Sequence, residues 1–366
     1  MTARMSALTH EIELLKSGPK DRYSWSYLLI IGIVFLVLVT LTVTAALVVR
    51  SDASHHSQSE LENVVEITVD SIKTDLQQSV SQLRAIQGFF HASQFVSREE
   101  FYLFVTPFLE ETGGIQAMEW IPRVRASEKV QFIRSVHEEE FEEFDIRPDS
   151  QSKDYFPITY LAPFTDNAAA LGFDLASEEV RGAALLTAWE SGEISLTEPI
   201  TLVQESGKQL AFLIYAPIYS SANVPTTLQA RRELLEGFAL GVFRFGDFIN
   251  NSIPDSFDSS IKITVIDSDD DDDDELILFT SEDSSQPASS GEGLVTNRDV
   301  KIADEEWQFR FAAPAGYGLG ALERIAWVLV LSLGILFSVI VLGVALLLYK
   351  GRQAALLLSV ERLSSE

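Results

Sequence analysis

The sequence predicts a mixed α+β region between two membrane-spanning helices, and three observations predict it. Uncharged apolar runs at residues 27–49 and 326–349 can each cross a bilayer, since a helix needs about 20 residues to span roughly 30 Å of hydrocarbon. Apolar residues recur every three or four positions over residues 54–92, which is the period of a helix. Short strand-like runs then alternate with helix-like segments up to residue 311.

Basic residues beside the two spans predict that both chain ends face the cytoplasm. Lys and Arg resist translocation, whereas long loops cross a membrane largely regardless of their charge. The basic residues are Arg4, Lys16, Lys20 and Arg22 before the first span, and Lys350, Arg352 and Arg362 after the second. The small residues at 43–45 resemble a signal-peptidase site, but the apolar run before them exceeds a usual signal region of about 7–15 residues. We therefore expect an uncleaved anchor.

The composition restricts the chemistry of the middle segment. The chain carries a net charge of −27, and because each cytoplasmic end carries about +1, residues 50–325 carry about −29. Such a segment repels nucleic acid, so no nucleic-acid partner is expected. Cysteine is absent, which excludes disulfides, thiol nucleophiles and cysteinyl metal sites. The acidity fits solubility in saline surroundings, cation binding or simple surface bias.

Helices are the main elements expected up to residue 143. A short amphipathic stretch at residues 7–16 precedes the first span. The helix over residues 54–92 has an apolar stripe that can pack on its own domain, on the same helix of a second chain, or on both. A second helix is expected over 97–112, because Ser97 and Glu100 form a capping-box pattern, although Pro107 should kink or shorten it. A strand over 115–124 and a charged helix over 127–143 follow.

From residue 156 onward the sequence predicts further strands. An extended segment over 156–164, a helix over 178–191 and a hairpin of strands 194–202 and 209–218 are expected, followed by a helix, strand and helix start over 228–249. A second antiparallel sheet is expected from strands at 261–266, 276–280, 294–302 and 307–311. The predicted boundaries are a cytoplasmic tail 1–26, span 27–49, stalk helix 50–95, membrane-distal subdomain 96–226, membrane-proximal subdomain 227–325, span 326–349 and cytoplasmic stub 350–366.

Several polar motifs of the sequence are expected to have structural roles. The run Asp269–Asp274 lacks the spaced ligands and glycine turn of an EF-hand loop, so a solvated hairpin tip is expected rather than a calcium site. His55 and His56, being adjacent, are expected to be solvated. Glu119 and Arg123 are expected to pair with each other as a structural contact. No phosphate loop, nucleophile elbow or zinc-protease helix is present, so no catalytic residue, metal or cofactor is expected.

The segment from Phe156 to Ile249 carries a family resemblance. It reads FPITYLAPFTDNAAALGFDLASEEVRGAALLTAWESGEISLTEPITLV, then QLAFLIYAPIY, then GFALGVFRFGDFI. These residues resemble the extracellular CHASE sensing domain of plant cytokinin-receptor histidine kinases and of many bacterial histidine kinases and diguanylate cyclases. MEWIPRV at 118–124 and WQFRFAAP at 307–314 also resemble that family, so the resemblance covers nearly all of residues 55–318.

The resemblance implies a long stalk helix followed by two PAS-like subdomains, with a small ligand bound in the membrane-distal one. The positions that match the family's ligand-facing aspartate are Asp166 or its rival Asp174, and Thr197 matches the ligand-facing threonine. Apolar walls with one or two polar groups suit a small amphipathic ligand. The candidate walls are Phe156, Tyr160, Phe164, Phe173, Leu213 and Tyr215. The alternative for each aromatic residue is a purely structural role in the core.

The sequence therefore predicts a two-pass sensor in the bacterial cell (inner) membrane, with its large domain periplasmic or extracellular. A homodimer formed through the stalk and membrane helices is expected. The output would be a cytoplasmic kinase or cyclase domain, lying either beyond residue 366 or in a partner protein. The alternative function is a non-sensing acidic scaffold or cation-binding module tethered to the membrane.

Overall fold

The computed structural model describes residues 20–139, 141–203, 209–221, 223–267, 276–281, 293–302 and 305–364. The amphipathic stretch at 7–16 and the aspartate run at 269–274 lie outside the described residues. The chain divides into two compact units. One comprises the residues up to Glu60 together with those from Gly316 onward, and the other comprises Leu61–Ala315.

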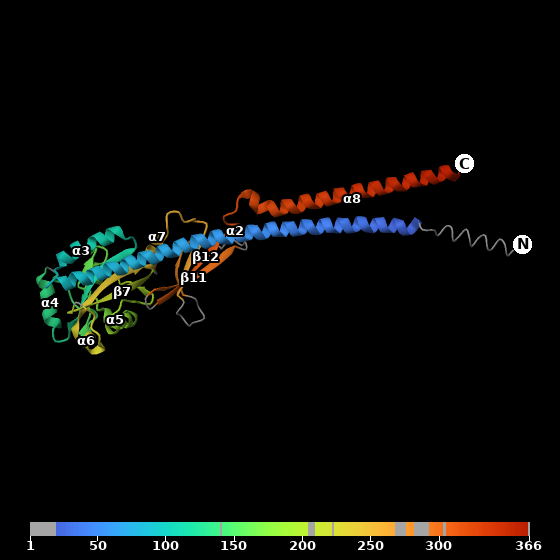
Figure 1. Cartoon of the computed structure of the whole chain (residues 1–366). Helices are drawn as coiled ribbons and strands as arrows, with labels where there is room; N and C mark the ends of the chain where they lie inside the picture. Colours follow the sequence, from blue (N-terminus) through green and yellow to red (C-terminus); the bar gives the residue numbers. More distant parts are fainter. Residues whose placement is uncertain are drawn as a thin grey trace. The chain divides into compact units, whose positions relative to one another are not determined.

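The first unit contains two long apolar helical stretches, which belong to α2 (Lys20–Ala92) and α8 (Ala321–Ser364) (Figure 1). Both helices are long and apolar enough to cross a membrane. Within α2, the hydroxyl groups of Thr40 and Thr42 donate to carbonyl oxygens four residues earlier, at 2.8 and 2.9 Å. These bonds matter because hydrocarbon offers a hydroxyl group no partner.

Small residues permit close packing of α2 against α8 within this unit. A side chain added at Gly334 would collide with Thr42. Ala46 and Ser338 are buried, at 4% and 1% exposure, whereas most side chains of the two apolar spans are exposed. Small side chains let two helix backbones approach closely, which is the usual source of contact between helices in lipid.

The remainder of α2, from Leu61 onward, belongs to the second unit. Its apolar stripe is buried within the single chain, which confirms packing on the domain; the stripe comprises Leu61, Val65, Val69, Ile72, Leu76 and Leu83. The predicted start near residue 54 differs from the structure, where the helix continues unbroken from the apolar stretch. Residues 50–54 contain no Gly or Pro to end it.

The second unit is built around a six-stranded antiparallel sheet. Its order is β4-β1-β8-β7-β5, with β6 also pairing with β7. The strands are β1 (Ile115–Pro122), β4 (Tyr160–Ala162), β5 (Ser195–Leu196), β6 (Ile200–Thr201), β7 (Leu210–Tyr219) and β8 (Leu235–Arg244). A separate ribbon pairs β2 (Val124–Arg125) with β3 (Asp154–Tyr155).

Helices cover both faces of the sheet. Side chains alternate between these two faces along each strand, so each strand contributes to the packing on both sides. On one face, Trp120 stacks on Phe90 of α2 at 4.2 Å between ring centroids. The same side carries α3 (Arg98–Glu111), while α5 (Glu179–Ser191) covers the other face (Figure 1). There, Ala117 and Ile121 of β1 share a core with Leu185 of α5. Two shorter helices, α4 (Lys129–Glu138) and α6 (Leu228–Leu234), complete this region.

The predicted second antiparallel sheet has the order β10-β9-β12-β11. Its strands are β9 (Lys262–Asp267), β10 (Ile277–Thr280), β11 (Leu294–Ile302) and β12 (Glu305–Ala313). Helix α7 (Phe245–Ser252) connects the two sheets. Phe212 of β7 contacts Phe245 of α7 and Trp307 of β12, with ring centroids 4.9 and 5.1 Å apart. The two sheets therefore share an aromatic core.

Several boundaries differ from expectation. The predicted subdomain boundary at residue 226 falls before β8, yet β8 pairs with both β1 and β7 inside the first sheet, and Leu61–Ala315 form one compact unit. The strand expected over 194–202 is split into β5 and β6 around Pro199, which has no N–H for a ladder. Pro107 neither ends nor shortens α3, and its predicted capping box between Ser97 and Glu100 is confirmed.

Candidate functional site

A small cavity lies between the first sheet and the segments that cover it on the α5 side. Its volume is about 20 Å³, which is room for about one water molecule. The lining is apolar except for two charged residues, and comprises Glu119, Ile158, Ala170, Leu175, Arg181, Leu202, Val203, Leu213, Leu240 and Val242. A carboxyl group and a guanidinium group among apolar walls make this the candidate ligand site.

Glu119 is the central polar group of the cavity. It occupies an inward position of β1, between Ala117 and Ile121, and is 1% exposed. Its Oε2 atom has no hydrogen-bond partner among the described residues. Burial raises the pKa of Glu119 to about 8, although the charge of Arg181 opposes this rise. The carboxyl group is therefore mostly protonated at neutral pH and can donate a hydrogen bond as well as accept one.

Tyr215 places a second polar group on the same face of the sheet. Leu240 of β8 pairs with Glu119 of β1 on one side and with Tyr215 of β7 on the other, so the three side chains form one row. Tyr215 is fully buried, and its hydroxyl group has no partner among the described residues. Burial raises the pKa of Tyr215 far above the neutral range, so its hydroxyl keeps its proton.

Arg181 supplies the positive charge from α5. Its side chain is held on two sides: Nη1 donates to Glu178 Oε2 at 2.9 Å, and Nη2 donates to the carbonyl oxygen of Thr201 at 2.6 Å. Its guanidinium also lies 5.7 Å from the centre of the Phe173 ring. Because Arg181 is only 7% exposed, its charge acts on Glu119 and Tyr215 through the interior of the protein.

The predicted site residues fall into three groups: those in or next to the cavity, those beside it that bond to the backbone, and those that lie away from it. Leu213 lines the cavity, and Tyr215 lies in the row described above. Phe156 lies in the adjoining core, where its ring contacts Trp189 and Phe238, and Phe173 packs against that core beneath Arg181.

Two predicted polar residues are buried beside the cavity but bond to the backbone. Thr197 Oγ1 accepts from the N–H of Leu213 at 3.0 Å. Asp174 Oδ1 accepts from the N–H groups of Phe156 and Ala176, at 2.8 and 3.3 Å. Burial raises the pKa of Asp174, and these two hydrogen bonds oppose the rise. Both side chains thus fix the walls of the site.

The remaining three predicted residues lie away from the cavity. Tyr160 faces α3, with the Arg98 guanidinium 4.7 Å from its ring centre. Phe164 is 40% exposed. Asp166 is exposed, whereas the neighbouring Asn167 is buried and accepts a 2.9 Å hydrogen bond from Gln116.

Sequence reasoning missed Glu119 and Arg181 as site residues. The expected pair of Glu119 with Arg123 is wrong, because Arg123 Nε donates to Asp154 Oδ1 at 2.8 Å while Glu119 points into the core. The available signal was the alternation of β1, which places residue 119 on the same face as Ala117 and Ile121. Among the described residues, no group of three His, Asp or Glu side chains is arranged to hold a metal ion.

Comparison with known proteins gives relatives among signalling proteins. The chain is 21% identical to the hybrid signal transduction histidine kinase A of Dictyostelium discoideum over 264 residues, which is 68% of this chain and 12% of that protein. The sensory domain of the Campylobacter jejuni chemoreceptor Tlp1 aligns with a TM-score of 0.41 and 12% identity, over 68% of this chain and 92% of that domain.

An extracellular ligand binding receptor from Desulfohalobium retbaense aligns with a TM-score of 0.38 and 9% identity, over 71% of this chain and 39% of that one. Residues 94–278 match the family model of the CHASE domain. That match covers half of the chain and includes the cavity and both of its charged residues. The chain therefore belongs to the CHASE domain family.

Proposed function

We propose that this chain is the sensor region of a membrane receptor, which binds a small ligand at Glu119, Arg181 and Tyr215. The observation that carries the proposal is the presence of two buried polar atoms, Glu119 Oε2 and the Tyr215 hydroxyl, without partners among the described residues. An unpaired buried polar group costs about 1–3 kcal/mol, and a ligand that pairs with it recovers part of that cost. The CHASE family and its signalling relative support the sensing role.

The ligand class follows from the walls. A suitable ligand is small and amphipathic, with an apolar body for Leu175, Leu213 and Val242 and at least one polar group for Glu119. Because the protonated carboxyl both donates and accepts, it suits a ring nitrogen beside an amino group, as in adenine-type compounds, as well as amides. Cytokinin itself is not singled out by these contacts.

Binding would be coupled to a conformational change. The cavity holds only about 20 Å³, so any ligand larger than water must displace its walls. Val203, at 43% exposure, marks the side of the cavity that is nearest to solvent. A ligand shifts an equilibrium between two states only by its difference in affinity for them, and a cavity that must open provides such a difference.

The proposed signal path leads through α2 and α8 to the cytoplasm. Both helices are long and apolar enough to cross a membrane, and the basic residues at their outer ends support an orientation with both termini inside. Dimerisation through α2 and α8 and a kinase or cyclase output, in this protein or in a partner, complete the proposal. The histidine kinase relative supports the kinase form of that output.

Ligand binding to the full chain in lipid nanodiscs tests the proposal. The chain is screened by thermal unfolding with adenine, N6-substituted adenines, amino acids and small amides. A specific ligand raises the melting temperature in proportion to the logarithm of its concentration. We expect Tyr215→Phe and Glu119→Gln to reduce that shift, because each alters a polar group in the cavity.

The matched control is Tyr102→Phe, which removes the same hydroxyl from an exposed residue of α3. Its ligand-induced shift should equal that of the wild type. Equal shifts for all three variants and the wild type would place the ligand elsewhere. A screen without any stabilising compound, followed by native mass spectrometry without any bound small molecule, would count against the sensor role.

A further inference from the structure

A second and much larger cavity lies on the surface of the same unit, between α5, α6 and the β2–β3 ribbon. It is an open groove of about 1190 Å³. Its lining comprises Arg123, Arg125, Ala126, Ser127, Lys153, Asp154, Leu186, Trp189, Glu190, Leu228, Gln229, Arg232 and Glu233. No residue of this groove lines the buried cavity at Glu119.

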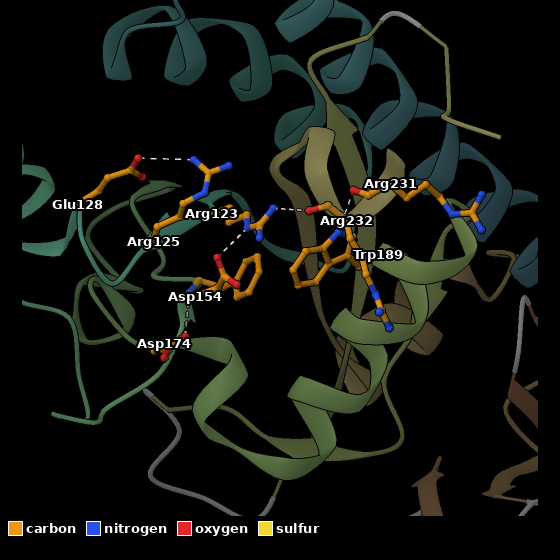
Figure 2. Close-up of polar contacts among 9 residues, drawn as sticks. Arg123, Arg125, Glu128, Asp154, Asp174, Trp189, Arg231 and Arg232 are labelled. Carbon is orange, nitrogen blue, oxygen red and sulfur yellow. Dashed lines mark hydrogen bonds and ion pairs between the residues drawn. The ribbon is translucent and has the colours of Figure 1, made fainter. Parts of the chain in front are cut away.

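The floor of the groove is a fixed cationic and aromatic surface. Figure 2 shows the Arg123 guanidinium between Asp154 and the main chain at Arg232, beside the Trp189 indole. Nη1 of Arg123 donates to the carbonyl oxygen of Arg232 at 2.5 Å, and the guanidinium carbon lies 4.6 Å from the centre of the Trp189 ring. The indole Nε1 donates to the carbonyl oxygen of Arg231 at 3.0 Å. These contacts fix the rotamers of both side chains.

The carboxylates of the groove already have partners. Asp154 pairs with Arg123, Glu190 pairs with Arg232, and Glu233 Oε1 accepts from Gln229 at 2.9 Å. Because each of these carboxylates already has a partner, it has little tendency to bind a further cation.

Two cations on the ribbon are in the opposite situation. Arg125 of β2 has one exposed ion pair, to Glu128 at 3.5 Å, a type of pair that contributes about 0–1 kcal/mol. Lys153, which precedes β3, is exposed and forms no side-chain ion pair with any described residue. Both line the groove, and the backbone N–H of Ala126 donates to the carbonyl oxygen of Lys153 at 3.0 Å, which holds the two chain segments together. They form a positively charged rim on a domain that carries about −29.

The opposite wall is apolar. Leu186 of α5 and Leu228 of α6 are 47% and 40% exposed, and both line the groove near Trp189. Exposed leucines beside a fixed indole provide a surface for an apolar body, while the rim provides charge-assisted hydrogen bonds for an anionic head.

We infer that this groove is a second binding site, which takes a small amphipathic organic anion with its carboxylate on Arg125 and Lys153 and its apolar body on Leu186, Leu228 and Trp189. The site is separate from the buried cavity and does not depend on the proposed sensing role of Glu119. Because the whole domain repels anions at long range, recognition here depends on short-range contacts.

The test uses phenylacetate and its neutral analogue phenylacetamide, which have the same ring and differ in charge. Each is titrated into the full chain in nanodiscs of neutral lipid and followed by isothermal calorimetry. We expect saturable binding of phenylacetate and at least tenfold weaker binding of phenylacetamide. The double variant Arg125→Gln with Lys153→Gln should weaken phenylacetate binding at least tenfold.

The matched control is Arg134→Gln, which removes an exposed cation of α4 that does not line the groove. Its affinity for phenylacetate should equal that of the wild type, as should that of Tyr215→Phe. Absence of saturable binding, or equal binding of the amide and the acid, overturns the inference. So does binding that Tyr215→Phe abolishes and the double variant leaves intact, because phenylacetate would then occupy the buried cavity.

Discussion

The buried carboxyl group of Glu119 makes the stability of the domain depend on pH in a direction that is unusual for an acidic residue. Its pKa is raised from about 4.5 to about 8 because burial penalises the ionised form. The folded state therefore binds a proton more tightly than the unfolded state. Stability from this group is fully present below pH 4.5 and is lost as the pH rises towards 8. The neutral and nearly isosteric variant Glu119→Gln lacks this loss.

The size of the effect follows from the two pKa values. Relative to a pH below 4.5, uptake of this proton on folding lowers the unfolding free energy by about 3 kcal/mol at pH 7 and by about 1 kcal/mol at pH 5. These values use about 1.4 kcal/mol per unit of pKa. The difference in unfolding free energy between Glu119→Gln and the wild type should therefore grow by about 2.5 kcal/mol between pH 5 and pH 7. For a domain of this size, that corresponds to a change of roughly 5–10 °C in relative melting temperature.

Thermal unfolding of the wild type and of Glu119→Gln in nanodiscs, from pH 5 to pH 8, measures this change. The control is Glu110→Gln, an exposed glutamate on α3, for which the difference from the wild type should not follow the same curve. A difference between Glu119→Gln and the wild type that stays constant over this pH range would refute the argument, since it would mean that Glu119 has the same pKa in both states.

Three further predictions concern stability. Ser97→Ala removes the side chain that caps α3 and should lower the unfolding free energy by about 1 kcal/mol in chemical denaturation. Gly334→Leu should lower the melting temperature of the chain in detergent because its side chain would collide with Thr42, whereas Gly343→Leu, with no heavy atom within 4 Å, should not. Trp307→Ala should cost about 3–5 kcal/mol, measured by denaturant unfolding, because it leaves a cavity in the aromatic core.

The sequence was sufficient to predict the elements whose signals are local. The capping box at Ser97, the apolar spans and the alternating strands of the second sheet each depend on residues within a few positions of one another. The place of β8 in the first sheet depends on pairing with β1, more than 100 residues earlier. The residues within and next to β8 give no indication of that pairing.

The candidate site shows the same limit. Leu213 and Tyr215 were predicted from a strand that is apolar throughout, and both lie on the cavity side of the sheet. The sequence does not show which buried polar groups lack partners, because partners come from distant segments. Asp174 has backbone donors at Phe156 and Ala176, whereas Glu119 has no such donor for Oε2 among the described residues. Only the folded structure distinguishes the paired carboxyl group of Asp174 from that of Glu119.

The aromatic cluster around Phe212 has a consequence for how this domain unfolds. Phe212 belongs to the first sheet and Trp307 to the second, and Phe245 of α7 contacts both rings. Helix α7 begins directly after β8 and contacts strands of both sheets, namely β7 and β8 of the first and β10 of the second. The two sheets should therefore lose their structure in one cooperative transition. A destabilising substitution far from the cavity, in β12, would then lower the stability of the ligand-binding sheet as much as a substitution within that sheet.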